Sequence, residues 1–197
     1  MILGITGCPG SGKSVLAKTV ARYGGNLIDA DEIGREVVEG NSSIIDALVD
    51  AFGEDIIRSG GSLDRRLLAR RVFVSSEATE KLNGIIHPRL ISLLVERIDI
   101  LRARGVRTVV DCALIFEWGI EDVFDIVVCV QAELERRVER IMKRDGRTRA
   151  EIEGFNTAQL PEAEKVRRAD LVVTNNGSLE RLEAFARMLS LLPDELP

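Results

Sequence analysis

Gly7-Cys8-Pro9-Gly10-Ser11-Gly12-Lys13-Ser14 fits the pattern G-x-x-x-x-G-K-[ST], which marks a loop that cradles phosphate groups. The residues before it, 2–6, are short, mostly apolar and typical of a buried strand. The residues after it place Leu16, Val20 and Tyr23 on one face of a helix. Because strand, loop and helix follow one another in this order, the segment predicts a nucleoside triphosphate site rather than a chance glycine-rich turn.

This loop offers three kinds of contact to a phosphate. Its glycines let backbone N–H groups approach phosphate oxygens, and the helix that follows directs its positive end at the same anion. Lys13 is long enough to reach the β- and γ-phosphates, and the Ser14 hydroxyl is suited to Mg²⁺. We therefore expect the nucleotide to contact Cys8, Pro9, Gly10, Ser11, Gly12, Lys13, Ser14 and Val15.

The composition of the chain is that of an acidic globular protein. Its 197 residues suit one domain with insertions, and 45% hydrophobic with 30% charged residues is an ordinary balance. A net charge of −5 gives no general attraction to nucleic acid or acidic membranes, so local basic groups must hold an anionic substrate. We expect a small-molecule substrate, no nucleic-acid or membrane partner, and a monomer or small homo-oligomer.

The three cysteines, Cys8, Cys112 and Cys129, are odd in number and lack C-x-x-C spacing. This argues against a disulfide framework or a zinc site and favours small buried thiols in a reducing compartment. Met1 leads directly into the first predicted strand, with no basic region and no apolar run of membrane-spanning length. We therefore expect a cytoplasmic protein.

Strand and helix patterns alternate along most of the chain. Short apolar runs predict five strands, at residues 2–6, 26–28, 107–112, 125–130 and 170–174. Alternation of this kind predicts an α/β fold of the P-loop NTPase type, a three-layer arrangement in which helices cover both faces of a five-stranded parallel sheet. The phosphate loop should lie at the carboxyl edge of the sheet, and we expect the second strand beside the first.

Two segments interrupt this alternation. Residues 41–104 contain no convincing strand, and they predict helices at 42–52, 63–73, 77–86 and 88–103, with Ser42-Ser43 as a cap and Pro88 at a helix start. Residues 144–168 are polar and predict a mobile helical flap, here called the lid segment. The chain is thus predicted to be a single domain, 1–197, with a nucleotide core at about 1–32, 105–143 and 169–197, a helical insertion at about 33–104 and a lid at about 144–168.

Helices flank the later strands as well. Residues 132–143 predict a charged helix whose apolar stripe consists of Leu134, Val138, Ile141 and Met142. A last helix is predicted at 179–191, capped by Ser178 and ended by Pro193.

Two strands are predicted to end in carboxylates, where open α/β sheets place their chemistry. Asp31 follows the second strand, and transfer of a phosphoryl group to a hydroxyl needs a carboxylate to orient the nucleophile and accept its proton. Asp111 ends the third strand, where an acid helps to hold Mg²⁺ through water. The alternatives are helix capping by Asp29 or Asp31, and a turn residue at Asp111.

A cluster of cations in the lid segment is suited to neutralising a transferring phosphoryl group and excluding water. Nearby carboxylates balance this charge, so some of the cations are expected to form only a solvated face. Arg144, where the chain leaves the preceding helix, is the first candidate for a functional cation. The full set is Arg144, Arg147, Arg149, Lys165, Arg167 and Arg168.

Other candidates have a weaker basis in the sequence. Asn175-Asn176-Gly177 could present backbone and amide groups to a purine edge, or could form only a turn. His87 has no acid near it in the sequence and favours a structural role. Arg65 and Arg66 lie where an acceptor substrate could dock, or face solvent.

Taken together, the motifs resemble those of the dephospho-CoA kinase family along almost the whole chain, in family order. They are Gly7–Ser14, Leu27–Asp31 with Ile33 and Arg35, Leu63–Arg65 with Val72-Phe73, Leu82-Asn83 with Ile86–Pro88, Leu114–Glu117, Arg144-Asp145, Gln159, Glu164-Lys165, Ala169-Asp170 and Asn175–Gly177.

The chain departs from the family pattern at five positions. Members usually have Gly at Cys8 and a residue other than proline at Pro9, and both are variable positions of the loop. Thr is common at Val15, but Ser14 supplies the Mg²⁺ hydroxyl. Pro is usual at Ala113, and many members carry Arg at Phe155, so this chain offers no cation there.

The resemblance implies ATP-dependent phosphorylation of the ribose 3′-hydroxyl of dephospho-CoA, the last step of coenzyme A synthesis, with the helical insertion as acceptor domain. It implies Asp31 as the catalytic base or orienting group, with Lys13 and Arg144 stabilising the phosphoryl group and Ser14 binding Mg²⁺. By the same resemblance, Arg65, His87 and Leu114 contact the acceptor, and Asn175 and Gly177 contact ATP.

The residues by themselves predict only a small-molecule kinase, and two other readings stay open. One is a nucleoside monophosphate or shikimate kinase, against which the long insertion with Leu63–Arg65 and His87-Pro88 argues. The other is a non-catalytic nucleotide-binding module. A guanine-nucleotide switch would carry N-K-x-D, which Thr174–Gly177 is not, and an ABC-type module would carry an LSGGQ-like signature, which the chain lacks.

Overall fold

The computed structural model describes residues 1–72, 74–146, 148–149, 152 and 159–194. The chain forms two compact units, one from Met1–Asp29 and Arg97–Pro197 and the other from Ala30–Glu96. Each unit has its own secondary structure and its own buried residues, and the two are described in turn.

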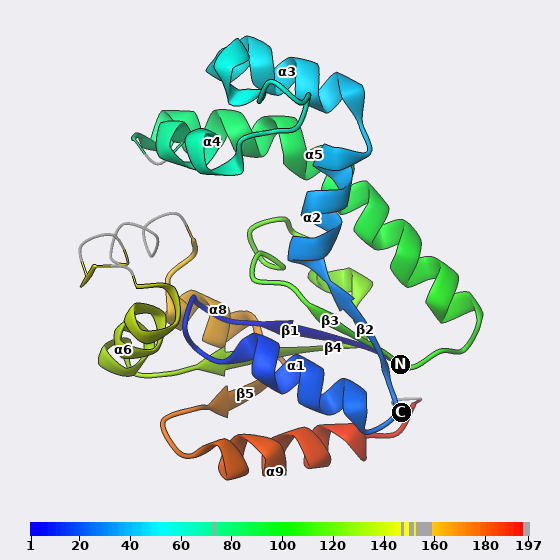
Figure 1. The fold of residues 1–197 in the computed structure, drawn as a ribbon. Helices are drawn as coiled ribbons and strands as arrows, with labels where there is room; N and C mark the ends of the chain where they lie inside the picture. The colour runs from blue at the N-terminus through cyan, green and yellow to red at the C-terminus, as the bar shows by residue number, and fades with distance from the viewer. Residues whose placement is uncertain (73, 147, 150–151, 153–158, 195–197) are drawn as a thin grey trace. The chain divides into compact units, whose positions relative to one another are not determined.

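The first unit contains a five-stranded parallel sheet, as predicted, in the order β2-β3-β1-β4-β5 (Figure 1). Its strands are β1 (Ile2–Thr6), β2 (Asn26–Asp29), β3 (Thr108–Asp111), β4 (Ile126–Gln131) and β5 (Leu171–Thr174). Each strand ends within one or two residues of its predicted end.

The sequence had predicted that the second strand lies beside the first. This was wrong, because β3 lies between β1 and β2. The burial of the strands explains the order. Val109 and Val110 of β3 are both fully buried and suit a central position, whereas β2 begins with exposed Asn26 and suits an edge. The register pairs Ile5 with Asp111, so the acid that ends β3 lies beside the strand that leads into the phosphate loop.

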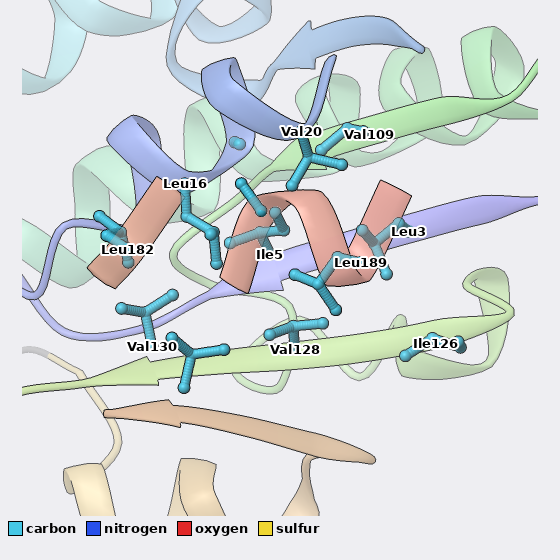
Figure 2. Packing of buried hydrophobic residues seen from close by; sticks show 13 residues of the cluster. Leu3, Ile5, Leu16, Val20, Val109, Ile126, Val128, Val130, Leu182 and Leu189 are labelled. Atoms are coloured by element: carbon cyan, nitrogen blue, oxygen red, sulfur yellow. The ribbon is translucent and has the colours of Figure 1, made fainter. Parts of the chain in front are cut away.

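One face of the sheet packs against α1 (Lys13–Arg22) and α9 (Leu179–Ser190). Figure 2 shows Leu3 and Ile5 of β1 facing Leu16 and Leu189 of these two helices. Burial of each such side chain stabilises the fold by roughly 1.5–3 kcal/mol. This packing fixes the start of α1, and therefore the loop before it, against the sheet.

The opposite face is covered by the segment that follows β3 and by α8 (Glu162–Arg168) (Figure 1). A Cβ at Gly4 of β1 would lie 2.9 Å from Ile115 and from Phe124, so glycine is required for this segment to pack on the strand. The segment contains a short 3₁₀ helix, η2 (Glu121–Val123). The turn after β3 is thus pressed onto the strand that leads into the phosphate loop.

The apolar stripe predicted for residues 132–143 is only partly buried in helix α6 (Leu134–Asp145). Val138 and Ile141 are buried, and they form a small cluster with Ile152. Leu134 and Met142 are exposed, and Arg137 is the further residue of this helix that is buried.

The second unit is helical, as predicted for this part of the chain. Its elements are α2 (Ala30–Glu39), α3 (Ser42–Phe52), η1 (Glu54–Ile56), α4 (Arg65–Val72) and the first part of α5 (Ser76–Ala103). The range predicted for α3, 42–52, is confirmed, but its predicted cap was wrong, and α4 begins at Arg65 and not at residue 63. Asn41, not Ser42 or Ser43, caps α3 by accepting bonds from two backbone N–H groups, and Asp64 does the same for α4.

Pro88 lies inside α5 and not at the start of a separate helix, as the sequence had predicted. An internal proline removes one backbone hydrogen bond and costs about 3 kcal/mol. Burial of Leu90 and Leu94, the next two buried residues of the helix, offsets this cost. Among the described residues, no helix is both long and apolar enough to cross a membrane.

Candidate active site

The predicted phosphate loop lies between β1 and α1, at the carboxyl end of a central strand. Gly12, the residue before α1, has φ of 99°, in the left-handed region that favours glycine. A Cβ there would lie 2.3 Å from the side-chain nitrogen of Asn175. The sequence therefore needs glycine at this position for conformation and for space.

Two side chains from other elements hold the carbonyl groups of the loop. The amide nitrogen of Asn175, which follows β5, donates to the Ser11 carbonyl at 2.7 Å. Arg140 of α6 donates to the carbonyls of Gly10, at 3.2 Å, and of Asn175, at 2.9 Å. These hydrogen bonds fix the orientation of the carbonyl groups and so help to define the shape of the loop.

These contacts change the interpretation of Asn175 and Gly177. The side chain of Asn175 is buried and supports the phosphate loop, a role that the sequence did not reveal. Gly177 lies exposed in the turn after β5. A direct contact of either residue with the purine stays a prediction.

Lys13 and Asp111 lie together at the carboxyl edge of the sheet. The ammonium of Lys13, the first residue of α1, is 3.8 Å from Oδ1 of Asp111, and the Asp111 side chain is only 5% exposed. Ser14, the next residue of α1, is half-buried. A hydroxyl and a carboxylate are hard oxygen ligands, and Mg²⁺ bound with a nucleotide takes few others from the protein, so this set fits the metal.

Arg144 lies in the last turn of α6 and is 69% exposed. Its guanidinium donates two hydrogen bonds, of 2.7 and 2.8 Å, to the carboxylate of Asp145. An exposed pair of this kind contributes little to stability.

The other predicted lid cations have several different surroundings. Arg149 pairs with Glu135 and Arg167 with Glu164, both at the surface, as the solvated-face alternative predicted. Arg147 and Phe155 lie outside the described residues. Arg168 stacks over the Phe116 ring, 4.8 Å from its centre, and pairs with Glu121. The prediction of Arg168 as a lid cation is therefore corrected, because the segment after β3 already engages its charge.

The prediction of Lys165 as a lid cation is corrected as well. Its side chain has no exposed surface, and its ammonium lies 2.7 Å from a carboxylate oxygen of Glu117. A cation that is buried and paired in this way does not line an open phosphate site.

All three cysteines are buried, as predicted. Burial raises the pKa of Cys8, which lies in the phosphate loop, and it raises the pKa of Cys129 in β4 to about 12. Both groups are therefore neutral thiols at physiological pH, which disfavours a role as nucleophile.

The predicted acceptor residues fall in both units. Asp31 is exposed in the first turn of α2, which begins directly after β2. Arg65, the first residue of α4, donates to Glu39 of α2 at 2.8 Å. His87 is half-buried in α5, and burial lowers its pKa below 6.5, which favours the neutral ring. Leu114 belongs to the other unit, in the turn after β3, where it is half-buried.

A parallel sheet with a glycine-rich phosphate loop after β1, a lysine and serine at the start of α1 and an acid at the end of β3 define a P-loop kinase fold. The family model described as dephospho-CoA kinase matches residues 1–181. The chain therefore belongs to the dephospho-CoA kinase family.

Individual relatives agree with this assignment. The chain is 40% identical to a dephospho-CoA kinase of Geobacter sulfurreducens over 183 residues, which covers 92% of this chain and 93% of the relative. It is 38% identical to that of Corynebacterium glutamicum over 188 residues, or 95% and 94% of the two chains. A solved structure from Thermus thermophilus has a TM-score of 0.77 and 37% identity, and covers 98% of both chains. Dephospho-CoA kinase from Campylobacter jejuni, at 22% identity, has a TM-score of 0.67 and shares the fold, over 95% and 94% of the two chains.

Proposed function

We propose that the protein transfers the γ-phosphoryl group of ATP to the ribose 3′-hydroxyl of dephospho-CoA, giving coenzyme A and ADP. The observation that carries the proposal is the family match over residues 1–181, which includes the phosphate loop, the end of β3 and the whole of the second unit. The proposal places the enzyme in the cytoplasm, where reduced thiols such as those of this chain persist.

On the donor side, the phosphate loop and the N-terminus of α1 would bind the phosphates of ATP through backbone N–H groups and the helix dipole. The Lys13 ammonium would leave Asp111 for the β- and γ-phosphate oxygens, and so stabilise the charge of the transferring group. Ser14 and Asp111 would hold Mg²⁺, Asp111 through water. When bound, Mg²⁺ supplies charge neutralisation at the phosphates.

On the acceptor side, the 3′-oxygen of the ribose attacks the γ-phosphorus while the bond from that phosphorus to the oxygen bridging to the β-phosphate breaks. Asp31 would orient the hydroxyl and accept its proton, so that ADP leaves as the anion. Arg144 would exchange Asp145 for the transferring phosphoryl group. Arg65, His87 and Leu114 would bind dephospho-CoA.

The substrate is tested by measuring ADP formation from ATP and Mg²⁺ with dephospho-CoA, with AMP, pantetheine phosphate and shikimate as parallel acceptors. We expect turnover with dephospho-CoA alone, and a product whose new phosphate is on the 3′-oxygen by ³¹P NMR. Turnover with AMP or shikimate in place of dephospho-CoA would overturn the proposal.

The role of Asp31 is tested by Asp31→Asn, which keeps the size of the side chain and removes its basicity. We expect kcat to fall by roughly 10²-fold or more, with ATP binding largely unchanged, because the carboxylate acts on the acceptor hydroxyl. Glu32→Gln is the matched control, since it removes a neighbouring exposed carboxylate from the same turn of α2. Near-normal turnover of Asp31→Asn would remove Asp31 from the mechanism.

A further inference from the structure

Lys165 is a fully buried cation outside the proposed catalytic set, and its ammonium has one ion pair and two hydrogen bonds. The ammonium lies 2.7 Å from Oε1 of Glu117 and donates to the carbonyl of Ala113 at 2.6 Å and to Oε1 of Gln159 at 3.4 Å. These contacts offset the cost of burying the ammonium, whereas Oε2 of Glu117 is buried without a hydrogen-bond partner among the described residues. The position of the ammonium is therefore fixed from three directions.

The Ala113 carbonyl connects this ammonium to the phosphate loop. The same oxygen accepts a second hydrogen bond, of 3.0 Å, from the hydroxyl of Thr6. Thr6 is the last residue of β1 and directly precedes Gly7, while Ala113 lies two residues after Asp111. One carbonyl thus links the start of the phosphate loop to the turn that follows the Asp111 carboxylate.

Glu117 connects the ammonium to a third segment. The Oε1 atom of Glu117 that contacts Lys165 also accepts the backbone N–H of Leu160 at 2.9 Å. Residues of the phosphate-loop strand, the turn after β3 and the segment leading into α8 therefore meet at a single charge pair. In the part of the chain that the structure describes, these contacts all lie within the first unit.

Stability by itself does not account for an ionic pair at this position. A well-packed apolar pair of similar volume is often as stable as a buried ion pair, because the desolvation of two charges offsets their attraction. What the ionic pair adds is direction, since an ammonium and its acceptors hold one another in a defined geometry.

We propose that Lys165 is a positioning residue for phosphoryl transfer: held by Glu117, it fixes the Ala113 carbonyl and thereby the spacing between the phosphate loop and Asp111. The inference rests on the proposed function in that Lys13 and Asp111 are taken to act on the nucleotide and its Mg²⁺. A displacement of about 1 Å at a reacting site lowers rates by as much as about 10²-fold. Removal of the ammonium should therefore impair the metal and phosphate side and spare the acceptor side.

The test compares Lys165→Met with Arg167→Met, which removes an exposed cation of the same helix whose partner is Glu164. For Lys165→Met we expect kcat to fall about 10- to 100-fold, a severalfold higher Mg²⁺ concentration at half-maximal rate, and KM for dephospho-CoA within about twofold of wild type. Arg167→Met should match the wild type in all three. Unchanged kcat and Mg²⁺ dependence in a folded Lys165→Met protein would overturn the proposal.

A double variant separates positioning from stability. Lys165→Met with Glu117→Gln removes both charges and keeps an acceptor for the Leu160 N–H group. We expect it to regain most of the thermal stability that Lys165→Met loses, without regaining kcat or the normal Mg²⁺ dependence. If thermal stability, kcat and the Mg²⁺ dependence all recovered, the ion pair would have only a structural role, and the proposal would be overturned.

Two further measurements keep the proposal testable on its own. If the Lys165 variants do not fold, Thr6→Val removes the second donor to Ala113 and leaves the ion pair intact, and it should shift the Mg²⁺ dependence in the same direction.

Calorimetric titration of ATP at several Mg²⁺ concentrations needs no acceptor. A normal titration for Thr6→Val and every folded Lys165 variant would overturn the positioning role, whereas failure of wild type to use dephospho-CoA would overturn the proposed function alone.

Discussion

Lys13 and Asp111 form an ion pair whose partners are both needed elsewhere once a nucleotide is bound. The ammonium lies 3.8 Å from the carboxylate across the ends of two adjacent parallel strands. A charge buried in this way is stabilised by the opposite charge. A phosphate oxygen can replace the carboxylate as partner of Lys13, and a hydrated Mg²⁺ can replace the ammonium as partner of Asp111. The pair therefore gives each charge an opposite charge nearby.

This arrangement predicts the effect of Asp111→Asn. The amide is similar in size but lacks the charge that attracts hydrated Mg²⁺, so we expect a higher Mg²⁺ concentration at half-maximal rate and a kcat lower by roughly 10- to 100-fold. Steady-state rates across a Mg²⁺ series measure both. Asp122→Asn, an exposed carboxylate of η2 in the same segment after β3, is the control. If the two variants have the same Mg²⁺ dependence, Asp111 has no part in binding the metal.

Single residues differ in how far their roles could be predicted from sequence. Lys13 and Ser14 were predictable because a spaced motif defines them and backbone geometry does the rest. Lys165 was not, because a lysine between charged neighbours looks the same whether it faces solvent or lies buried beside Glu117. Local pattern carries no information on a partner 48 positions away in the chain, as Glu117 is from Lys165.

Helix α6 shows the same limit for a whole element. Its sequence contains Arg136, Arg137, Arg140 and Arg144, and the period of the helix shows which of these share a face. The structure gives each a different environment: Arg136 is exposed beside Glu133, Arg137 is buried, and Arg140 contacts the phosphate loop. The sequence predicted the helix and its charge, and the packing of the sheet decided the rest.

The contact between α6 and the phosphate loop predicts the effect of Arg140→Gln. Loss of the guanidinium leaves the carbonyls of Gly10 and Asn175 without its hydrogen bonds, so the loop should hold its phosphate-binding shape less well. We expect KM for ATP to rise about tenfold, and the free energy of unfolding to fall by about 1–3 kcal/mol, as for loss of hydrogen bonds to a charged group. Nucleotide titrations and urea unfolding measure the two effects.

Arg136→Gln is the control, because Arg136 lies on the same helix and pairs only at the surface with Glu133 among the described residues. It should change neither quantity measurably. An Arg140→Gln protein with unchanged KM for ATP would show that Asn175 alone is sufficient to support the loop.

For the molecule as a whole, the sequence predicted the fold class because five apolar strands alternate with helices around a phosphate loop. It did not predict the order of the strands, because a right-handed crossover fixes the hand of a connection but not the number of strand positions that it spans. The difference matters for the site, since it places Asp111 and not the end of β2 beside β1. The second unit was predictable as helical, but the continuity of α5 through Pro88 was not.

The folded protein as a whole should also lose stability in mild acid through a single side chain. His87 is the only histidine of the chain, and burial lowers its pKa below the ordinary value of 6.5. As the pH falls below 6.5, the unfolded chain therefore takes up a proton at His87 before the folded protein does. Because the unfolded state then holds more protons, the free energy of unfolding decreases as the pH falls toward the pKa of the folded state. Carboxyl groups titrate mostly at lower pH, near 4.

His87→Gln removes this titration and should make stability less dependent on pH. We expect the urea midpoint to fall between pH 7.5 and pH 5.5 in the wild type, and to fall less in the variant. The quantity to compare is the change of midpoint within each protein, because a constant cost of the substitution then cancels, as do contributions from groups that both proteins share. Equal changes in the two proteins would show that His87 is protonated as readily in the folded state as in the unfolded chain. His87 would then have its ordinary pKa, and burial would not contribute to keeping its ring neutral.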